Sequence, residues 1–337
     1  MLATPVTAVG RSPSGPRPIN LAKDSRQVLQ LLDLSFGRRY RSLGQRVLYD
    51  RLSLSQTNPL VLRFNMMTSG FIPGFVWEED GQIVGNLTLL GSEVPGRYLI
   101  ANVAVHPDFR RRGIARGILQ EALDHIVDQG GRTVMLQVES DNDPAITLYL
   151  TSGFHLVGTM KRWQTSSTNL RYVPIQADTV GQVRSIGRRD WRAAYHLDRA
   201  IVHPDLNWPV PPTPDFYKTG ILRSIVDLLS GRKFNAWITE LRTGTSSKQK
   251  LIGLISISSE WGRPTWLRIR VDPTWQEEVE PRLMNNAIKY LKRNRSGTVR
   301  ISHPADDQLA NQMLTEANFR IQRSLTIMTL DLINNGR

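Results

Sequence analysis

The chain has 337 residues, of which 40% are hydrophobic and 22% charged, and this globular balance excludes a largely disordered protein. No stretch reaches the ~18–20 uninterrupted apolar residues that a membrane-spanning helix needs, and the sequence holds no cysteine, which excludes disulfides and thiolate chemistry. We therefore expect a cytoplasmic protein of two domains, whose net charge of +13 favours an anionic partner such as a nucleic acid, a phosphate-bearing cofactor or an acidic protein surface.

The first elements read as a tail, a helix and a meander of strands. Residues 1–16 are rich in Pro, Gly and Ser and predict a flexible tail. Asp24 has capping-box spacing and predicts the start of a helix. Residues 74–90 predict a hairpin around an Asp-Gly turn, and a third strand is expected over 98–105.

The next elements alternate between helix and strand. Residues 114–129 carry two apolar rows at i+4 spacing and predict the strongest helix of the chain. Residues 133–138 predict a buried strand, and Asn142 with Pro144 predicts the start of a short helix. This alternation implies a parallel crossover, and hence an α/β fold with a mixed central sheet flanked by helices.

The layout repeats about 166 positions later. The segment IVGNLTL at 83–89 corresponds to LIGLISI at 251–257, and VHPDF at 105–109 corresponds to VDPTW at 271–275. Matches at nearly one offset indicate a duplication. We predict a first domain at 17–164, a linker at 165–182 and a second domain at 183–332.

Arginines surround the turn before the strongest helix. Arg110, Gly113, Ala115 and Arg116 lie where the chain passes from a strand into that helix. A glycine allows close backbone approach, and the N–H groups that begin a helix attract anions. The segment therefore predicts a phosphate site, whereas arginines alone would indicate only a solvated basic turn.

The pattern R-x-x-G-x-A at 110–115 resembles the acyl-CoA loop of the GNAT N-acetyltransferase superfamily. Residues 142–154 fit that family's N-x-x-A-x-x-L-Y-x-x-x-G-F segment at the family's spacing. Within the family, the first half is most similar to the ribosomal-protein alanine acetyltransferase group, and the two-copy length resembles mycothiol synthase. The resemblance implies a tandem GNAT fold with acetyl-CoA as cosubstrate.

The resemblance also implies roles for individual residues. Tyr149 would be the general acid that protonates the departing CoA thiolate, and Asn142 would cap the short helix and meet the pantetheine arm. The remaining cofactor contacts would be the strand residues Val103, Ala104 and Val105 and the loop residues Arg110, Arg111, Arg112, Gly113, Ile114, Ala115 and Arg116.

The general base departs from the family pattern. Gln137 stands where the alanine acetyltransferase group has a glutamate, and an amide cannot accept the proton. Glu139 lies two residues on and shares the same side of the strand, so it is the nearest substitute. A chain of water molecules is the alternative.

The second copy lacks these features and is predicted to be degenerate. Glutamates at 277, 278 and 280 are expected to face the phosphate position, where they would repel CoA, and Leu314 replaces the general acid. We therefore place one acetyl-CoA site in the first half.

The sequence thus predicts an N-acetyltransferase that acts on a primary amine by direct attack. Two other functions are kept as alternatives, namely a non-catalytic acyl-CoA-binding or sensing protein and a basic ribosome- or nucleic-acid-associated protein. No nucleic-acid-binding motif supports the latter, so a nucleic-acid partner is not expected, and neither is a membrane. The scattered histidines contain no HExxH pair, so no metal is expected.

Overall fold

The computed structural model describes residues 14–42, 73–173, 183–207, 212–220, 227, 231–242, 249–294 and 297–332. These residues form two compact units. The first contains the described residues up to Gln137, residues 144–155 and those from Met328 on, and the second contains residues 138–143 and 156–327. Most of the predicted tail, residues 1–13, and half of the predicted linker, residues 174–182, lie outside the described residues. The other half of the linker, residues 165–173, includes the end of a strand and the helix Ser167–Arg171.

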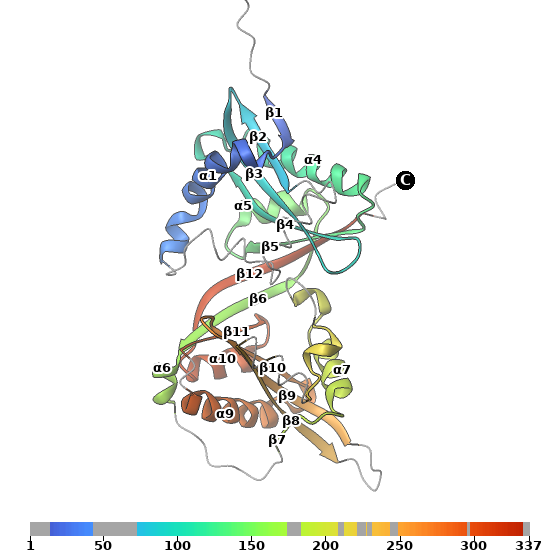
Figure 1. Cartoon of the computed structure of the whole chain (residues 1–337), viewed down its shortest axis with the longest axis vertical. Coiled ribbons are helices and arrows are strands. Elements are labelled where there is room, and N and C mark those ends of the chain that lie inside the picture. Colours follow the sequence, from blue (N-terminus) through green and yellow to red (C-terminus); the bar gives the residue numbers. More distant parts are fainter. Residues whose placement is uncertain are drawn as a thin grey trace, which may run out of the picture. The chain divides into compact units, whose positions relative to one another are not determined.

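The first unit is built around a mixed sheet with the strand order β1-β2-β3-β4-β5 (Figure 1). Adjacent strands are antiparallel except β4 and β5, which are parallel, so the predicted crossover is confirmed. Its elements are β1 (Gly15–Pro18), α1 (Leu21–Ser42), β2 (Gly74–Glu79), β3 (Gln82–Gly91), β4 (Arg97–Val105), α4 (Ile114–Asp128), β5 (Thr133–Glu139) and α5 (Asp143–Leu150).

Two helices cover opposite faces of this sheet. Val28 and Leu31 of α1 pack on Val76 of β2. On the other face, α4 lies so close to β3 that a Cβ atom on Gly85 would come within 2.6 Å of Ile118. Glycine at this position therefore allows the helix carrying the phosphate loop to sit directly on the sheet.

The first helix begins earlier than the sequence predicted. The cap is Asn20, whose side-chain oxygen accepts hydrogen bonds from the backbone N–H groups of Ala22 (3.1 Å) and Lys23 (3.3 Å). Asp24 lies inside the first turn and forms an ion pair with Arg17, at 2.7 Å. Its carboxylate also accepts a hydrogen bond from the backbone N–H of Asn20 (2.7 Å), so Asp24 helps to cap the helix from inside the first turn and is not the N-cap that the sequence predicted.

The second unit repeats the plan. Its sheet has the order β12-β6-β11-β10-β9-β8-β7, with β10 and β11 parallel. The strands are β6 (His155–Ser166), β7 (Val183–Ser185), β8 (Arg232–Arg242), β9 (Gln249–Glu260), β10 (Thr265–Val271), β11 (Thr298–Pro304) and β12 (Arg320–Asp331). The helices are α6 (Ser167–Arg171), α7 (Trp191–Ile201), α9 (Gln276–Asn294) and α10 (Gln308–Glu316).

One ion-pair arrangement occurs in both units. Arg17 joins Asp24 of α1 to Glu78 of β2. Arg184 likewise joins Asp190, which directly precedes α7, to Glu240 of β8. In each unit the arginine lowers the pKa of the aspartate by a direct hydrogen bond. A repeated network of this kind supports the duplication inferred from the sequence.

The two copies of the motif pattern do not coincide with the two compact units. Strand β6 follows the first copy in the sequence, but it pairs with β11 inside the second unit. Residues 328–331 of β12 belong to the first unit, where the Thr133 hydroxyl donates to the Asp331 carboxylate (3.3 Å). The copies therefore exchange their last strands. None of the helices among the described residues is long and apolar enough to cross a membrane.

Candidate active site

A bulge in β4 separates this strand from β5. Asn102 has a φ of 53°, and the register between β3 and β4 shifts at this point. Strand β4 pairs with β5 as far as Ile100 and Leu136, although β4 itself continues to Val105. Among the described strands, none therefore pairs with Val103, Ala104 and Val105 on the β5 side. Apart from the Val105 carbonyl, which accepts a hydrogen bond from Arg110, their backbone groups on that side are available for a ligand.

Side-chain amides support the bulge. The amide of Asn86 donates to the carbonyl oxygen of Asn102 (2.9 Å), and the amide of Asn102 donates to the Thr88 hydroxyl (3.2 Å). Asn86 is 1% exposed, and its side-chain oxygen has no hydrogen-bond partner among the described residues. Sequence reasoning assigned no role to Asn86. The signal was a polar residue inside the apolar strand IVGNLTL.

The phosphate loop leads into an uncapped helix. Gly113 has a φ of 79° at the N-cap of α4 and no side chain caps the helix there. The first hydrogen bond of the helix runs from the N–H of Gly117 to the carbonyl of Gly113, so the N–H groups of Ile114, Ala115 and Arg116 have no partner within the helix. A Cβ atom on Gly113 would meet nothing within 4 Å. This open helix end suits an anion.

The loop arginines are held by neutral oxygens. Arg110 donates to the carbonyl of Val105 (3.2 Å), and Arg112 donates to the carbonyl of Asp108 (3.0 Å). Arg116 donates to the hydroxyl of Thr151 (2.7 Å), just beyond α5, and so links the loop to that helix. No carboxylate among the described residues pairs with Arg110, Arg111, Arg112 or Arg116, and all four are exposed. Their charge is therefore available to a phosphate.

Tyr149 lies near the end of α5. Its side chain is 6% exposed, and its ring meets that of Phe154 edge-on at a centroid distance of 5.8 Å. Burial raises the pKa of its hydroxyl above the ordinary tyrosine value. The hydroxyl therefore stays protonated at neutral pH, which is compatible with a general acid.

Glu139 forms an ion pair that the sequence did not reveal. Its Oε1 accepts a hydrogen bond from the Nε of Arg323 (2.8 Å) and another from a terminal nitrogen of the same guanidinium. The two residues are 184 positions apart, on β5 and β12, so no local pattern could connect them. Glu139 and Asn142 both fall in residues 138–143, which belong to the second unit, while Val103–Val105, the loop and Tyr149 belong to the first.

The second unit builds this region differently. In the first unit four residues separate the 3-10 helix Pro107–Phe109 from α4, whereas α9 follows the 3-10 helix Pro273–Trp275 without a gap. A helical turn thus replaces the phosphate loop. Glu277 and Glu278 are exposed in that turn, but Glu280 is buried. The expectation that Glu280 faces the phosphate position is therefore wrong.

Comparisons with known proteins identify the first copy. Residues 27–154 match the acetyltransferase (GNAT) family. The N-alpha-acetyltransferase RimI of Mycobacterium tuberculosis is 39% identical over 85 residues, which are 25% of this chain and 52% of that protein. The peptidyl-lysine N-acetyltransferase YiaC of Escherichia coli is 39% identical over 83 residues, which are 25% of this chain and 50% of that protein. The chain thus spans about half the length of these curated relatives.

A solved structure extends the likeness in fold. The GCN5-related N-acetyltransferase from Sphaerobacter thermophilus superposes with a TM-score of 0.58 at 15% sequence identity, covering 94% of this chain and 95% of its own. The chain therefore has the fold of this GCN5-related N-acetyltransferase over nearly its whole length, and residues 27–154 match the GNAT family. The α/β class predicted from the sequence, with mixed sheets flanked by helices, is confirmed.

Proposed function

We propose that this protein transfers the acetyl group of acetyl-CoA to a primary amine at a site in the first unit. One observation carries the proposal. An uncapped helix end lies a few residues after the bulged strand β4, and the arginines around it have no carboxylate partner among the described residues. Phosphates of CoA would bind at Gly113–Arg116, and the acetyl and pantetheine parts would lie along Val103–Val105.

The reaction needs no acyl-enzyme. The amine nitrogen attacks the thioester carbon, a C–N bond forms and the C–S bond breaks. Backbone N–H groups of β4 would polarise the carbonyl, and the Tyr149 hydroxyl would give its proton to the departing thiolate. The proton lost by the amine would go to water or to a protein base, for which Glu139 is the candidate that the sequence suggested.

The names of the relatives suggest which acceptors to test first. RimI is named for acetylation of an α-amine, and YiaC for acetylation of peptidyl lysine. We propose that the acceptor of this protein is a polypeptide amine of one of these two kinds.

Release of CoA thiol from acetyl-CoA tests the proposal. The acceptors are a peptide with a free N-terminus and no lysine, an N-terminally blocked peptide with one lysine, the same peptide blocked at both positions, and a set of small amines. We expect turnover with one of the first two peptides and none with the doubly blocked peptide. Turnover with small amines alone would reject the polypeptide acceptor but keep the acetyltransferase.

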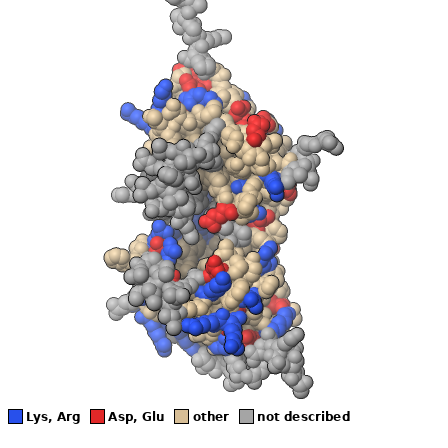
Figure 2. Space-filling model, turned by 45° about the vertical axis from the view of Figure 1, so that its right-hand side comes forward, with Lys and Arg blue, Asp and Glu red and all other residues tan. Residues whose placement is uncertain are grey.

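The two alternative functions give different results in the same experiment. A sensing protein would bind acetyl-CoA without turnover of any acceptor. A nucleic-acid-associated protein would bind RNA or DNA with an affinity that falls steeply with salt. Figure 2 shows Lys and Arg gathered on part of the second unit with Asp and Glu among them, rather than a surface of one sign.

A further inference from the structure

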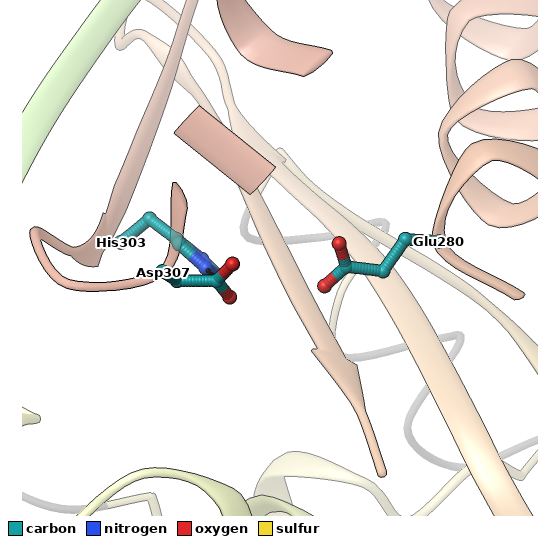
Figure 3. Close-up of side chains that lie close together, drawn as sticks. All are labelled: Glu280, His303 and Asp307. Atoms are coloured by element: carbon teal, nitrogen blue, oxygen red, sulfur yellow. Dashed lines mark hydrogen bonds and ion pairs between the residues drawn. The ribbon is translucent and has the colours of Figure 1, made fainter. Parts of the chain in front are cut away.

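Three ionisable side chains meet inside the second unit. Glu280 comes from α9, His303 from β11, and Asp307 directly precedes α10. One possible ligand atom of each lies within 4.8 Å of those of the other two. Figure 3 shows the Glu280 carboxylate pointing toward the His303–Asp307 pair. The proposed acetyltransferase mechanism uses none of the three residues.

Two of these groups are buried with unsatisfied polar atoms. Glu280 is 1% exposed and His303 is 3% exposed. Oε2 of Glu280 and Nδ1 of His303 have no hydrogen-bond partner among the described residues. Leaving Oε2 of Glu280 buried and unpaired is costly, and a bound ion would satisfy it, whereas Nδ1 of His303 is not the nitrogen that faces Asp307.

The remaining atoms hold the cluster in place. Nε2 of His303 is 2.7 Å from Oδ2 of Asp307. The other Asp307 oxygen accepts from the backbone N–H of Ala310 (3.1 Å), and Gln276 donates to Oδ2 (3.1 Å). Hydrogen bonds of this kind orient ligands from the outside of a metal site.

The charges in this region favour a cation. Glu280 and Asp307 bring two carboxylates into one cluster inside the second unit. Among the described residues no lysine or arginine forms an ion pair with either carboxylate, and His303 is the partner of Asp307. A divalent ion would supply the positive charge.

We propose that Glu280, His303 and Asp307 bind one divalent transition-metal ion, with zinc as the best match. One imidazole nitrogen and two carboxylate oxygens are zinc ligands, and water would complete four-coordination. For zinc–ligand distances of about 2.0–2.1 Å, His303 and Asp307 would move apart by roughly 0.6 Å, and the ion would replace the hydrogen they share. Glu280, whose ligand atom lies within 4.8 Å of the other two, would move toward them. The site would tie α9, β11 and α10 together.

The first unit cannot form this site. In the second unit, Val279 and Leu283 of α9 lie over Gly253. In the first unit, Ile114 and Ile118 of α4 lie over Gly85 in the same way. In this comparison of the two helices, Glu280 corresponds to Ala115. The same offset of 165 pairs Leu314 with Tyr149, and each of these two carbonyls accepts from the backbone N–H of a phenylalanine five residues later. By this offset His303 and Asp307 correspond to Val138 and Asn142. The second copy thus carries ligands where the first has none, and the proposal is independent of the acetyltransferase activity.

Calorimetric titration with zinc sulfate tests the site. The full-length protein, stripped with a chelator, is expected to bind one zinc per chain. Glu280→Gln should weaken binding by at least about 100-fold, because loss of even an outer partner of a metal ligand costs 10–100-fold. Glu278→Gln is the matched control, since it removes the same charge from an exposed position on the same helix, and it should bind zinc like the wild type.

Thermal unfolding provides a second readout. Zinc should raise the unfolding temperature of the wild type and of the Glu278→Gln variant but not of the Glu280→Gln variant. If the Glu280→Gln variant does not fold, His303→Asn takes its place. A third experiment uses the wild type alone. Cobalt bound in place of zinc should give the intense visible absorption of four-coordinate cobalt.

Three results would overturn the proposal. These are no zinc binding at about 100 μM metal, equal affinity in the Glu280→Gln variant and the wild type, or only the weak bands of six-coordinate cobalt. Any of them would mean that the cluster shares protons instead of holding an ion.

Discussion

The hydroxyl of Tyr149 is protonated at neutral pH, as an ordinary tyrosine is, and burial raises its pKa further. The protonated state is the one that a general acid needs before the thiolate leaves. An interaction used mainly in the transition state affects turnover more than binding. We therefore expect Tyr149→Phe to lower kcat by ~10²-fold, with the affinity for acetyl-CoA nearly unchanged. Steady-state kinetics and calorimetry measure the two quantities. A kcat within about threefold of the wild type would instead assign protonation to water.

Glu139 can be tested as a base separately from its ion pair with Arg323. If the carboxylate accepts the proton, Glu139→Gln lowers kcat by ~10²-fold, whereas Arg323→Gln keeps the carboxylate and most of the activity. If only the ion pair matters, the two variants lose activity and stability alike. The pH dependence of kcat, measured on both variants, separates these cases, and equal profiles would reject Glu139 as the base.

A substitution of Gly113 tests whether the loop before α4 binds the phosphates of acetyl-CoA. A glutamate there would carry negative charge at the open helix end and would be strained at a φ of 79°. Gly113→Glu should abolish acetyl-CoA binding in calorimetry. Gly130→Glu is the matched control, because Gly130 at the other end of the same helix also has a positive φ (71°) and open space around its Cα. Equal affinities in the two variants would contradict the loop assignment.

At the scale of elements, the contact between helix and sheet depends on one glycine in each unit. A Cβ atom on Gly85 would lie 2.8 Å from Ile114, and one on Gly253 would lie 2.5 Å from Val279. We expect Gly85→Ala and Gly253→Ala each to lower the free energy of unfolding by about 1–3 kcal/mol, as overpacked cores do. Urea denaturation measures the change. If neither variant is destabilised, the helices do not pack on the strands at these glycines.

Elements set by local patterns were predictable, and those set by distant partners were not. The hairpin at 74–90, the helix from Ile114 and the short helix after Asn142 follow from turn residues, apolar spacing and caps, and the structure contains all three. The start of α1 was misplaced because Asn20, and not Asp24, is the residue whose side chain accepts from the first free N–H groups. The Glu139–Arg323 pair and the buried cluster around Glu280 were not predicted, because Glu139 and Glu280 are each far from their partners in the sequence and become their neighbours only in the folded protein.

At the scale of the molecule, the duplication preserves the frame and changes the site. Both units keep the arginine–aspartate–glutamate network and the glycine beneath the long helix. These features stabilise the fold whether or not a ligand binds. The loop before the long helix has no such role, and it is there that the copies differ: an open helix end in one, and a closed helical turn with buried Glu280 in the other.

This difference predicts one acetyl-CoA per chain. In the second unit α9 begins directly after the 3-10 helix, so the N–H groups that would meet the phosphates are displaced, and Glu277 and Glu278 add like charge in the first turn. Leu314, at the position of Tyr149, has no proton to donate. Calorimetric titration should therefore give a stoichiometry of one for the wild type and no binding for Gly113→Glu. A stoichiometry of two, or one remaining equivalent in that variant, would show that the second unit binds the cosubstrate as well.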